Sequence, residues 1–306
     1  MTSPPPDLLM RSAANALPPI QPDRLAALQA TYASAVAAKR TSNLLAFAII
    51  VACILLSGWV AQVDLPKLWA NAGNFLSYFD RTLRLDSGMR VWTDIGEWFW
   101  GLKKWSWLLG ETILIAYVGT LTGAVGALVL CFLATKNLTK SATTRWVVRR
   151  FLEFCRTVPE IVFALIFVVA FGLGPVPGVL AIALHTLGAL GKLFAEVAEN
   201  IDMKPVQGIE STGALWVEQI RFGALPQVMP SFASYALLRF EINVRGAAVM
   251  GFVGAGGIGH NLLEAIRKFY YSDVSVILIL LILTVMVIDL VTEQVRHKLG
   301  GYEVRP

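Results

Sequence analysis

The chain has 306 residues, of which 56% are hydrophobic and only 15% are charged. Soluble domains carry nearer a quarter of charged residues, so this composition excludes an ordinary soluble domain and predicts a bundle of membrane helices. The net charge of +5 could suit a nucleic-acid partner, but the positions of Lys and Arg assign it to membrane orientation, and no nucleic-acid partner is expected.

The first 106 residues divide into three parts. Residues 1–43 are rich in Pro and Ala and predict a cytosolic extension with a helix over Pro22–Arg40. Leu44–Val63 is long enough to span a membrane and begins too late for a signal peptide, so we expect a retained anchor. Asp64–Ser106 is rich in tryptophan, which favours the headgroup layer. We expect external helices on the membrane surface, or alternatively a surface for a partner.

Further apolar runs complete a prediction of about six spans, which defines an all-α, polytopic membrane protein. These runs are Trp107–Leu133, Val158–Leu173, Val176–Glu196, Val228–Val253 and Val274–Val291. With both termini in the cytosol, the cytosolic segments hold sixteen Lys and Arg and the external segments hold eight. This excess favours that orientation, because positive residues concentrate on the cytosolic side.

A polar, amphipathic insert over residues 207–226 separates two of these spans and faces the cytosol in that orientation. Gly213-Ala214 is followed, about a dozen residues later, by Leu225-Pro226. This spacing resembles the loop by which the permeases of bacterial ABC importers dock on their ATPase subunit, although Gln207 replaces the acidic residue of that motif. The resemblance implies that the following residues contact an ATPase: Gln207, Glu210, Gly213, Ala214, Leu225 and Pro226.

The expected span Val228–Val253 contains Arg239, Glu241 and Arg245. A charge at mid-bilayer costs at least about 2.5 kcal/mol on insertion scales, so such residues face the bundle interior or a water-filled path. Glu241 and Arg245 share a helix face and could form a structural ion pair. Alternatively, Arg239 or Arg245 lines a translocation path and attracts a phosphonate or phosphate-like anion, whose geometry suits a guanidinium.

Three other polar residues lie at or within spans. Glu160 follows Pro159, and it fits either the acidic first turn of a helix or the same path as Arg239. His185 is interpreted as a hydrogen-bonded structural residue rather than a ligand. Asp289, near the end of the last span, is expected to be interfacial or paired.

Residues 254–259 match the G-x-G-x-x-G pattern of dinucleotide sites through Gly254, Gly256 and Gly259, with Gly257 between them. That pattern needs a preceding strand and a later acidic residue, whereas this one follows a membrane helix. We therefore interpret it as a tight turn, and as a candidate gate. The sequence has no phosphate-binding loop for ATP and no metal or hydrolase motif, so we expect no cofactor in this chain, and ATP-Mg in a separate ATPase subunit.

Together, Arg156–Glu160, the 207–226 insert and Arg239–Gly259 resemble the permease subunit of phosphonate ABC importers, the PhnE family. The resemblance covers residues 107–296 and implies the type I importer fold there. It further implies a non-catalytic homodimer in the inner membrane, two ATPase subunits, and a periplasmic or lipid-anchored phosphonate-binding protein. ATP binding would draw the docking loops together and reorient the bundle.

Two alternatives remain open on the sequence. The chain could be an ABC permease for another small solute, such as phosphite, phosphate or methionine. It could instead be an ion-coupled secondary transporter that uses Glu241 and Arg245 as a relay. An intramembrane enzyme is a more distant possibility, because no nucleophile, base or metal constellation is present.

Overall fold

A computed structural model describes residues 22–300, and helices dominate this range. The chain forms two compact units, residues 1–74 and residues 75–306. In the first unit, α2 (Pro22–Val60) is one continuous helix of 39 residues, followed by the short α3 (Leu65–Ala70). The sequence predicted a separate helix and anchor here. They merge because no glycine or proline interrupts the chain between residues 23 and 57.

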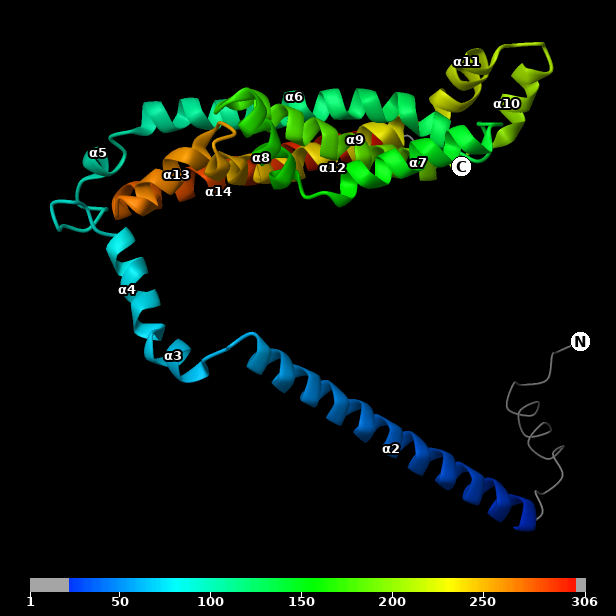
Figure 1. The fold of residues 1–306 in the computed structure, drawn as a ribbon, viewed down its shortest axis with the longest axis horizontal. Coiled ribbons are helices and arrows are strands. Elements are labelled where there is room, and N and C mark those ends of the chain that lie inside the picture. Colours follow the sequence, from blue (N-terminus) through cyan, green and yellow to red (C-terminus); the bar gives the residue numbers. More distant parts are fainter. Residues whose placement is uncertain (1–21, 301–306) are drawn as a thin grey trace, which may run out of the picture. The chain divides into compact units, whose positions relative to one another are not determined.

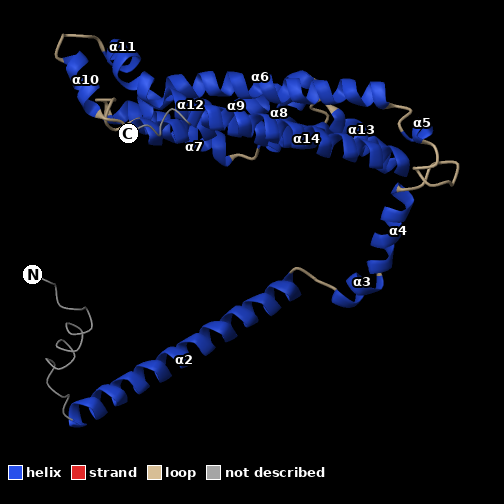
Figure 2. Cartoon of the chain, turned by 180° about the vertical axis from the view of Figure 1, so that it is seen from behind, coloured by secondary structure: helices blue, strands red, loops and turns tan. Residues whose placement is uncertain are grey.

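The second unit is a bundle of long helices joined by short ones (Figures 1 and 2). Its long helices α6, α9, α12 and α14 run side by side in both views. The elements in chain order are α4 (Ala72–Thr82, which begins before the boundary between the units), α5 (Ile95–Trp98), α6 (Leu102–Ala134), α7 (Ala142–Thr157), α8 (Glu160–Phe171), α9 (Pro175–Glu199), α10 (Met203–Glu210), α11 (Trp216–Glu218), the π-helix η1 (Gln219–Ala224), α12 (Leu225–Met250), the 3₁₀ turn η2 (Gly251–Val253), α13 (Ile258–Arg267) and α14 (Tyr271–Gly300).

Four helices in the described range are long and apolar enough to cross a membrane: α2, α6 with α5, α9 and α14. Residues 142–171 would provide a fifth span if the bent pair α7–α8 counts as one. α12 coincides with the expected span Val228–Val253 and has 26 residues. It falls outside this group because Arg239, Glu241 and Arg245 lower its hydropathy. The all-α membrane fold expected from the sequence is therefore confirmed, with a polar helix among its long members.

The expected third span, Val158–Leu173, corresponds to the short helix α8, and a sharp bend precedes it. α7 and α8 meet at an angle of 87°. Pro159 precedes the first residue of α8, and Val158 is extended with ψ 124°, as expected for a residue before proline. α8 has only 12 residues, about 18 Å at 1.5 Å per residue, which is shorter than a hydrocarbon core of about 30 Å.

Glycines allow α6 to lie directly against α9. A Cβ atom at Gly119 would lie 2.7 Å from Ile182 Cγ2, and one at Gly123 would lie 2.6 Å from the Ala183 carbonyl oxygen. Small residues at helix contacts favour association within a membrane, because lipid provides no hydrophobic force between helices. The stripe continues at Gly126, which lies against Leu187.

This close approach places a buried hydrogen-bonded centre between three helices. Asn243 of α12 has no exposed surface, and its amide nitrogen donates to Thr120 of α6 and to Thr186 of α9, both at 2.8 Å. Thr120 in turn donates to the Ala116 carbonyl at 2.6 Å. The centre gives the Asn243 amide nitrogen and the Thr120 hydroxyl partners that lipid could not provide, and it fixes the register of α12 against the α6–α9 pair.

The tryptophan-rich segment is partly built into the bundle. Trp105 is buried, Trp98 donates to Ser275 at 3.0 Å, and Trp100 donates to Asp273 at 2.9 Å. Part of the predicted interfacial surface is still free, because the side chains of Trp69, Trp92, Trp100 and Trp107 are exposed.

Before these tryptophans, Asp80 closes a short turn. Its carboxylate pairs with Arg84 and with Arg90, each at 2.7 Å. Hydrogen bonds from Arg84 and then from Arg90 hold the pKa of Asp80 below its ordinary value.

The glycine contacts give a direct stability prediction. We expect Gly123→Ala to lower the thermal unfolding midpoint in detergent by several degrees, because the new methyl group would press on the Ala183 backbone. Gly110→Ala is the matched control on the same helix, since no atom lies within 4 Å of its added Cβ. Alanine favours the helix by about 1 kcal/mol in both variants, so equal midpoints would contradict close α6–α9 packing.

Candidate functional site

The insert between α9 and α12 folds as a helical hairpin, Met203–Ala224, which we call the α10–η1 hairpin. α10 packs against η1, where a Cβ atom at Gly223 would lie 3.0 Å from Val206 Cα. Gly213 turns the chain with φ +84°, a conformation that favours glycine. Asp202 caps α10 by accepting from the Lys204 amide at 3.0 Å.

Side-chain hydrogen bonds fix the base of the hairpin and one of its sides. Gln227 exchanges two hydrogen bonds with the Asp202 backbone, each at 3.1 Å, and also donates to the Gly223 carbonyl at 2.7 Å. Trp216 donates to the Leu138 carbonyl, between α6 and α7, at 2.8 Å. The hairpin is therefore attached to the bundle at points far apart in the sequence.

The second half of the hairpin, after the turn at Gly213, exposes three apolar side chains that the sequence analysis did not single out. Leu215 is 73% exposed, Val217 64% and Phe222 61%. Among the residues predicted to contact an ATPase, Gln207 and Glu210 are exposed on α10, and Gly213-Ala214 lie in the turn. Leu225 and Pro226 instead begin α12. An exposed apolar group flanked by polar residues suits contact with another protein.

The charges of α12 divide into two groups, and the first is an ion network with α14. Arg245 pairs with Glu241 one helical turn away and with Asp289 at 3.3 Å, and Arg296 lies 3.7 Å from Glu241. The Glu241 side chain is only 13% exposed. Two arginines and two carboxylates balance one another, which permits these charges to lie within a membrane helix. Asp289 is thus paired, as one of its expected interpretations required.

Arg239 forms the second group and differs from the first. Its buried Nε atom has no hydrogen-bond partner, which is also true of Arg296 Nε. Unlike Arg296, however, Arg239 takes part in no ion pair in the described part of the chain. It interacts electrostatically with Glu160, at the start of α8, and with His185 of α9. A guanidinium that has an unpartnered Nε and no ion pair inside a bundle can bind an anion bearing several oxygens.

Glu160 and His185 are held by neighbouring helices. A Cβ atom at Gly246 would lie 2.3 Å from the Glu160 carboxylate, so the missing side chain of Gly246 makes room for the acid on the Arg239 face of α12. His185 Nδ1 lies 3.1 Å from the Val158 carbonyl at the α7–α8 break. Because a carbonyl only accepts, Nδ1 donates, which confirms the expected structural hydrogen bond.

The glycine turn over residues 254–259 is tightly packed. Gly254, Gly256 and Gly257 all have φ near +80°. Cβ atoms would lie 2.8 Å from Pro175 Cα at Gly256, and 1.9 Å from the Ala248 carbonyl oxygen at Gly259. The Ile258 amide donates to Thr112 Oγ1 of α6 at 2.9 Å. The turn connects α12 to α13 and packs against α6 and the start of α9. It follows the helical segments α12 and η2, whereas the glycine motif of a dinucleotide site follows a β-strand.

Together, these features define a class: a polytopic helical membrane protein with charged groups on one long helix and an exposed helical hairpin between two others. The chain belongs to the family of binding-protein-dependent transport system inner membrane components, whose sequence profile matches residues 127–299. It is therefore a multi-pass inner-membrane transport component and not an enzyme subunit.

Three curated relatives show how the family resembles this chain. The phosphite transport system permease protein PtxC of Stutzerimonas stutzeri is 37% identical over 219 residues, which cover 70% of this chain and 80% of PtxC. The phosphate-import permease protein PhnE of Mycolicibacterium smegmatis is 34% identical over 245 residues, 79% of this chain and 43% of that protein. The cryptic phosphonate transport system permease protein PhnE2 of Escherichia coli K12 is 50% identical over 117 residues, 38% of this chain and 96% of PhnE2.

Solved structures confirm the fold. A chain of the inward-facing methionine ABC transporter MetNI superposes with a TM-score of 0.56 at 19% identity, covering 65% of this chain and 96% of that chain. The likeness at this identity concerns the architecture alone. It confirms the type I importer fold that the sequence resemblance implied.

Proposed function

We propose that the chain is the permease subunit of an ATP-driven importer for phosphonates or related phosphorus oxyanions. The observation that carries this proposal is Arg239 on a polar membrane helix, a guanidinium that has a buried, unpartnered nitrogen and no ion pair among the described residues. The relatives described above are named for phosphite, phosphate and phosphonate, which share the tetrahedral phosphorus-oxygen group that guanidinium binds well.

In this proposal, Arg239 attracts the anion, and the nearby carboxylate of Glu160 lowers the affinity of Arg239 for it. The two residues interact electrostatically without forming an ion pair. A nearby carboxylate offsets part of the positive potential, so an oxyanion would bind weakly enough to leave again. Passage requires such weak binding, because a fully unopposed arginine would retain its ligand.

The other predicted path residues receive different roles. Glu241 and Arg245 stay candidates, but their network with Asp289 and Arg296 supports a structural role in joining α12 to α14. The turn formed by Gly254, Gly256, Gly257 and Gly259 is proposed as an external gate. Its support is the close backbone packing against α6 and α9.

The remaining proposals concern topology and partners. Both termini are assigned to the cytosol, where the α10–η1 hairpin would meet an ATPase, and a binding protein would deliver substrate outside. Residues 1–43 would form the cytosolic extension, 44–63 the anchor, 64–106 the external segment and 107–296 the transport domain. The permease is proposed to act as a homodimer, as the resemblance implies, with ATP-Mg bound by the ATPase.

The hairpin assignment predicts a loss of ATPase binding in one surface variant. Leu215→Glu places a charge among exposed apolar side chains, and we expect it to lower the amount of co-purified ATPase about tenfold, as for an interface hot spot. Met89→Glu is the control, because Met89 is 51% exposed and lies outside the hairpin. Normal ATPase recovery with Leu215→Glu would contradict docking at this surface.

The anion assignment predicts a transport defect without an assembly defect. Arg239→Gln should lower the uptake of labelled methylphosphonate by about tenfold in proteoliposomes that contain the ATPase and binding protein, since a charged hydrogen bond is lost. Arg239→Lys should retain part of the uptake, because it keeps the charge without the planar fork. Arg150→Gln, in an exposed pair with Glu153, is the control.

Assembly decides between the two interpretations of Arg239. The proposal requires that Arg239→Gln recover the same amount of ATPase as the wild type. An equal loss of uptake and of ATPase recovery would assign Arg239 a structural role instead.

A further inference from the structure

The linker between α6 and α7, residues 135–141, contacts the ends of α6 and α9 on one side and the α10–η1 hairpin on the other. It follows the last residue of α6, where helix carbonyls lack partners within the helix. Thr139 Oγ1 donates back to the Phe132 carbonyl of α6 at 2.7 Å, and Leu138 is buried in the core. The linker is therefore folded onto the bundle.

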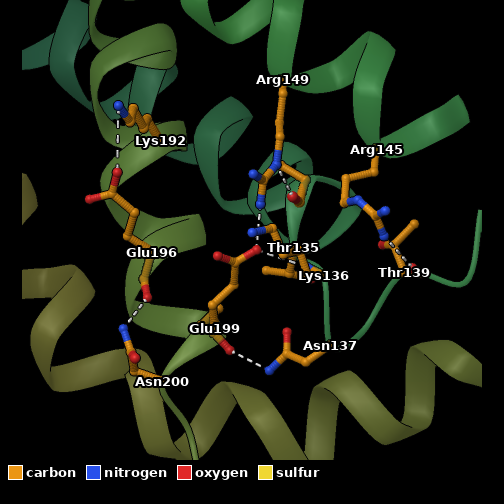
Figure 3. Close-up of polar contacts among 12 residues, drawn as sticks. Thr135, Lys136, Asn137, Thr139, Arg145, Arg149, Lys192, Glu196, Glu199 and Asn200 are labelled. Atoms are coloured by element: carbon orange, nitrogen blue, oxygen red, sulfur yellow. Dashed lines mark hydrogen bonds and ion pairs between the residues drawn. The ribbon is translucent and has the colours of Figure 1, made fainter. Parts of the chain in front are cut away.

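Arg149 of α7 and Glu199 of α9 clamp the start of this linker. Arg149 Nε donates to the Ala134 carbonyl at the end of α6 at 2.7 Å, and its terminal nitrogen pairs with Glu199. Glu199 Oε1 also accepts from the Lys136 amide at 2.8 Å. The two side chains thus join α6, α7, α9 and the linker, as Figure 3 shows.

The same linker holds the hairpin on its other side. Its Leu138 carbonyl accepts from Trp216 at 2.8 Å, and Lys140 lies 3.2 Å from Glu210 of α10. Asn137 Nδ2 donates to the Ala198 carbonyl at 2.9 Å and lies 3.4 Å from Met203 Sδ, at the start of α10. A displacement of the hairpin therefore acts on the linker, and the clamp connects the linker to the long helices.

We propose that Arg149 and Glu199 are positioning residues that transmit movement of the hairpin to α6 and α9. This inference rests on the proposed function, in which an ATPase moves the hairpin. Without the clamp, the linker would bend at Lys136 while α6 and α9 stayed in place. ATP would then be hydrolysed with less transport.

Two properties separate this pair from neighbouring ion pairs. Lys192–Glu196 and Arg150–Glu153 each lie within one helix, so neither can connect helices. Arg149 and Glu199 are also less exposed than those pairs, at 33% and 24%. They border a cavity of about 300 Å³, which Glu153, Lys192 and Glu196 line as well. Water in that cavity can hydrate a single remaining partner, which favours a folded variant.

The test is the ratio of uptake to ATP hydrolysis in proteoliposomes containing the complete complex. Glu199→Gln keeps an oxygen that can accept from the Lys136 amide but removes the charge that Arg149 pairs with. We expect hydrolysis close to the wild-type rate and about fivefold less uptake per ATP, within the range by which single residues change coupling between sites. Arg149→Lys should give a smaller loss, and Glu196→Gln on the same helix is the control.

The outcomes separate the clamp from the proposed function. If the wild-type complex couples uptake to ATP hydrolysis and Glu199→Gln has the same ratio of uptake to hydrolysis, the clamp is overturned and the proposed function stands. Parallel loss of hydrolysis and uptake would also overturn it, because that result indicates a docking or folding defect. A wild type that binds no ATPase would overturn the proposed function and the clamp together. If Glu199→Gln does not assemble, Arg149→Lys carries the same test.

Discussion

Lipid offers no hydrogen bonds, so a polar group within this bundle needs a partner from the chain itself or from a ligand. The structure meets this constraint at the Asn243 amide nitrogen, which donates to two threonines, and at Arg245, which two carboxylates neutralise. Arg239 is treated differently, since no ion pair neutralises its charge among the described residues and its buried Nε has no partner. The contrast between these residues of one helix is the physical basis for assigning structure to most of α12 and anion binding to Arg239.

The hydrogen bonds of Asn243 depend on the stripe of glycines along α6. Gly119 and Gly123 bring α6 close enough to α9 for Thr120 and Thr186 to reach the same amide of Asn243. Close packing also makes the long helices a stiff unit. A permease needs such stiffness if movement at its ATPase-facing end is to alter the translocation path of the substrate. The clamp at Arg149 and Glu199 lies where such movement would enter the bundle.

Much of this fold could be predicted from the sequence, because apolar runs of about 20 residues have few alternatives to a membrane helix. Pro159 also marked the start of α8, but the break it causes depends on how α7 packs, which the sequence did not reveal. The pairing of Arg149 with Glu199 and the bond from Trp216 to Leu138 join residues 50 and 78 positions apart. Such contacts leave no local pattern, so only the folded chain reveals the clamp.

The central claim is that ATP drives a phosphorus oxyanion through this chain. The most direct measurement is uptake of labelled methylphosphonate by the wild-type complex in sealed proteoliposomes, with and without ATP inside. The account predicts accumulation that requires ATP and that phosphite, but not methionine, inhibits. Uptake driven by an ion gradient without ATP, or ATP-driven uptake of methionine but not of methylphosphonate, would contradict it.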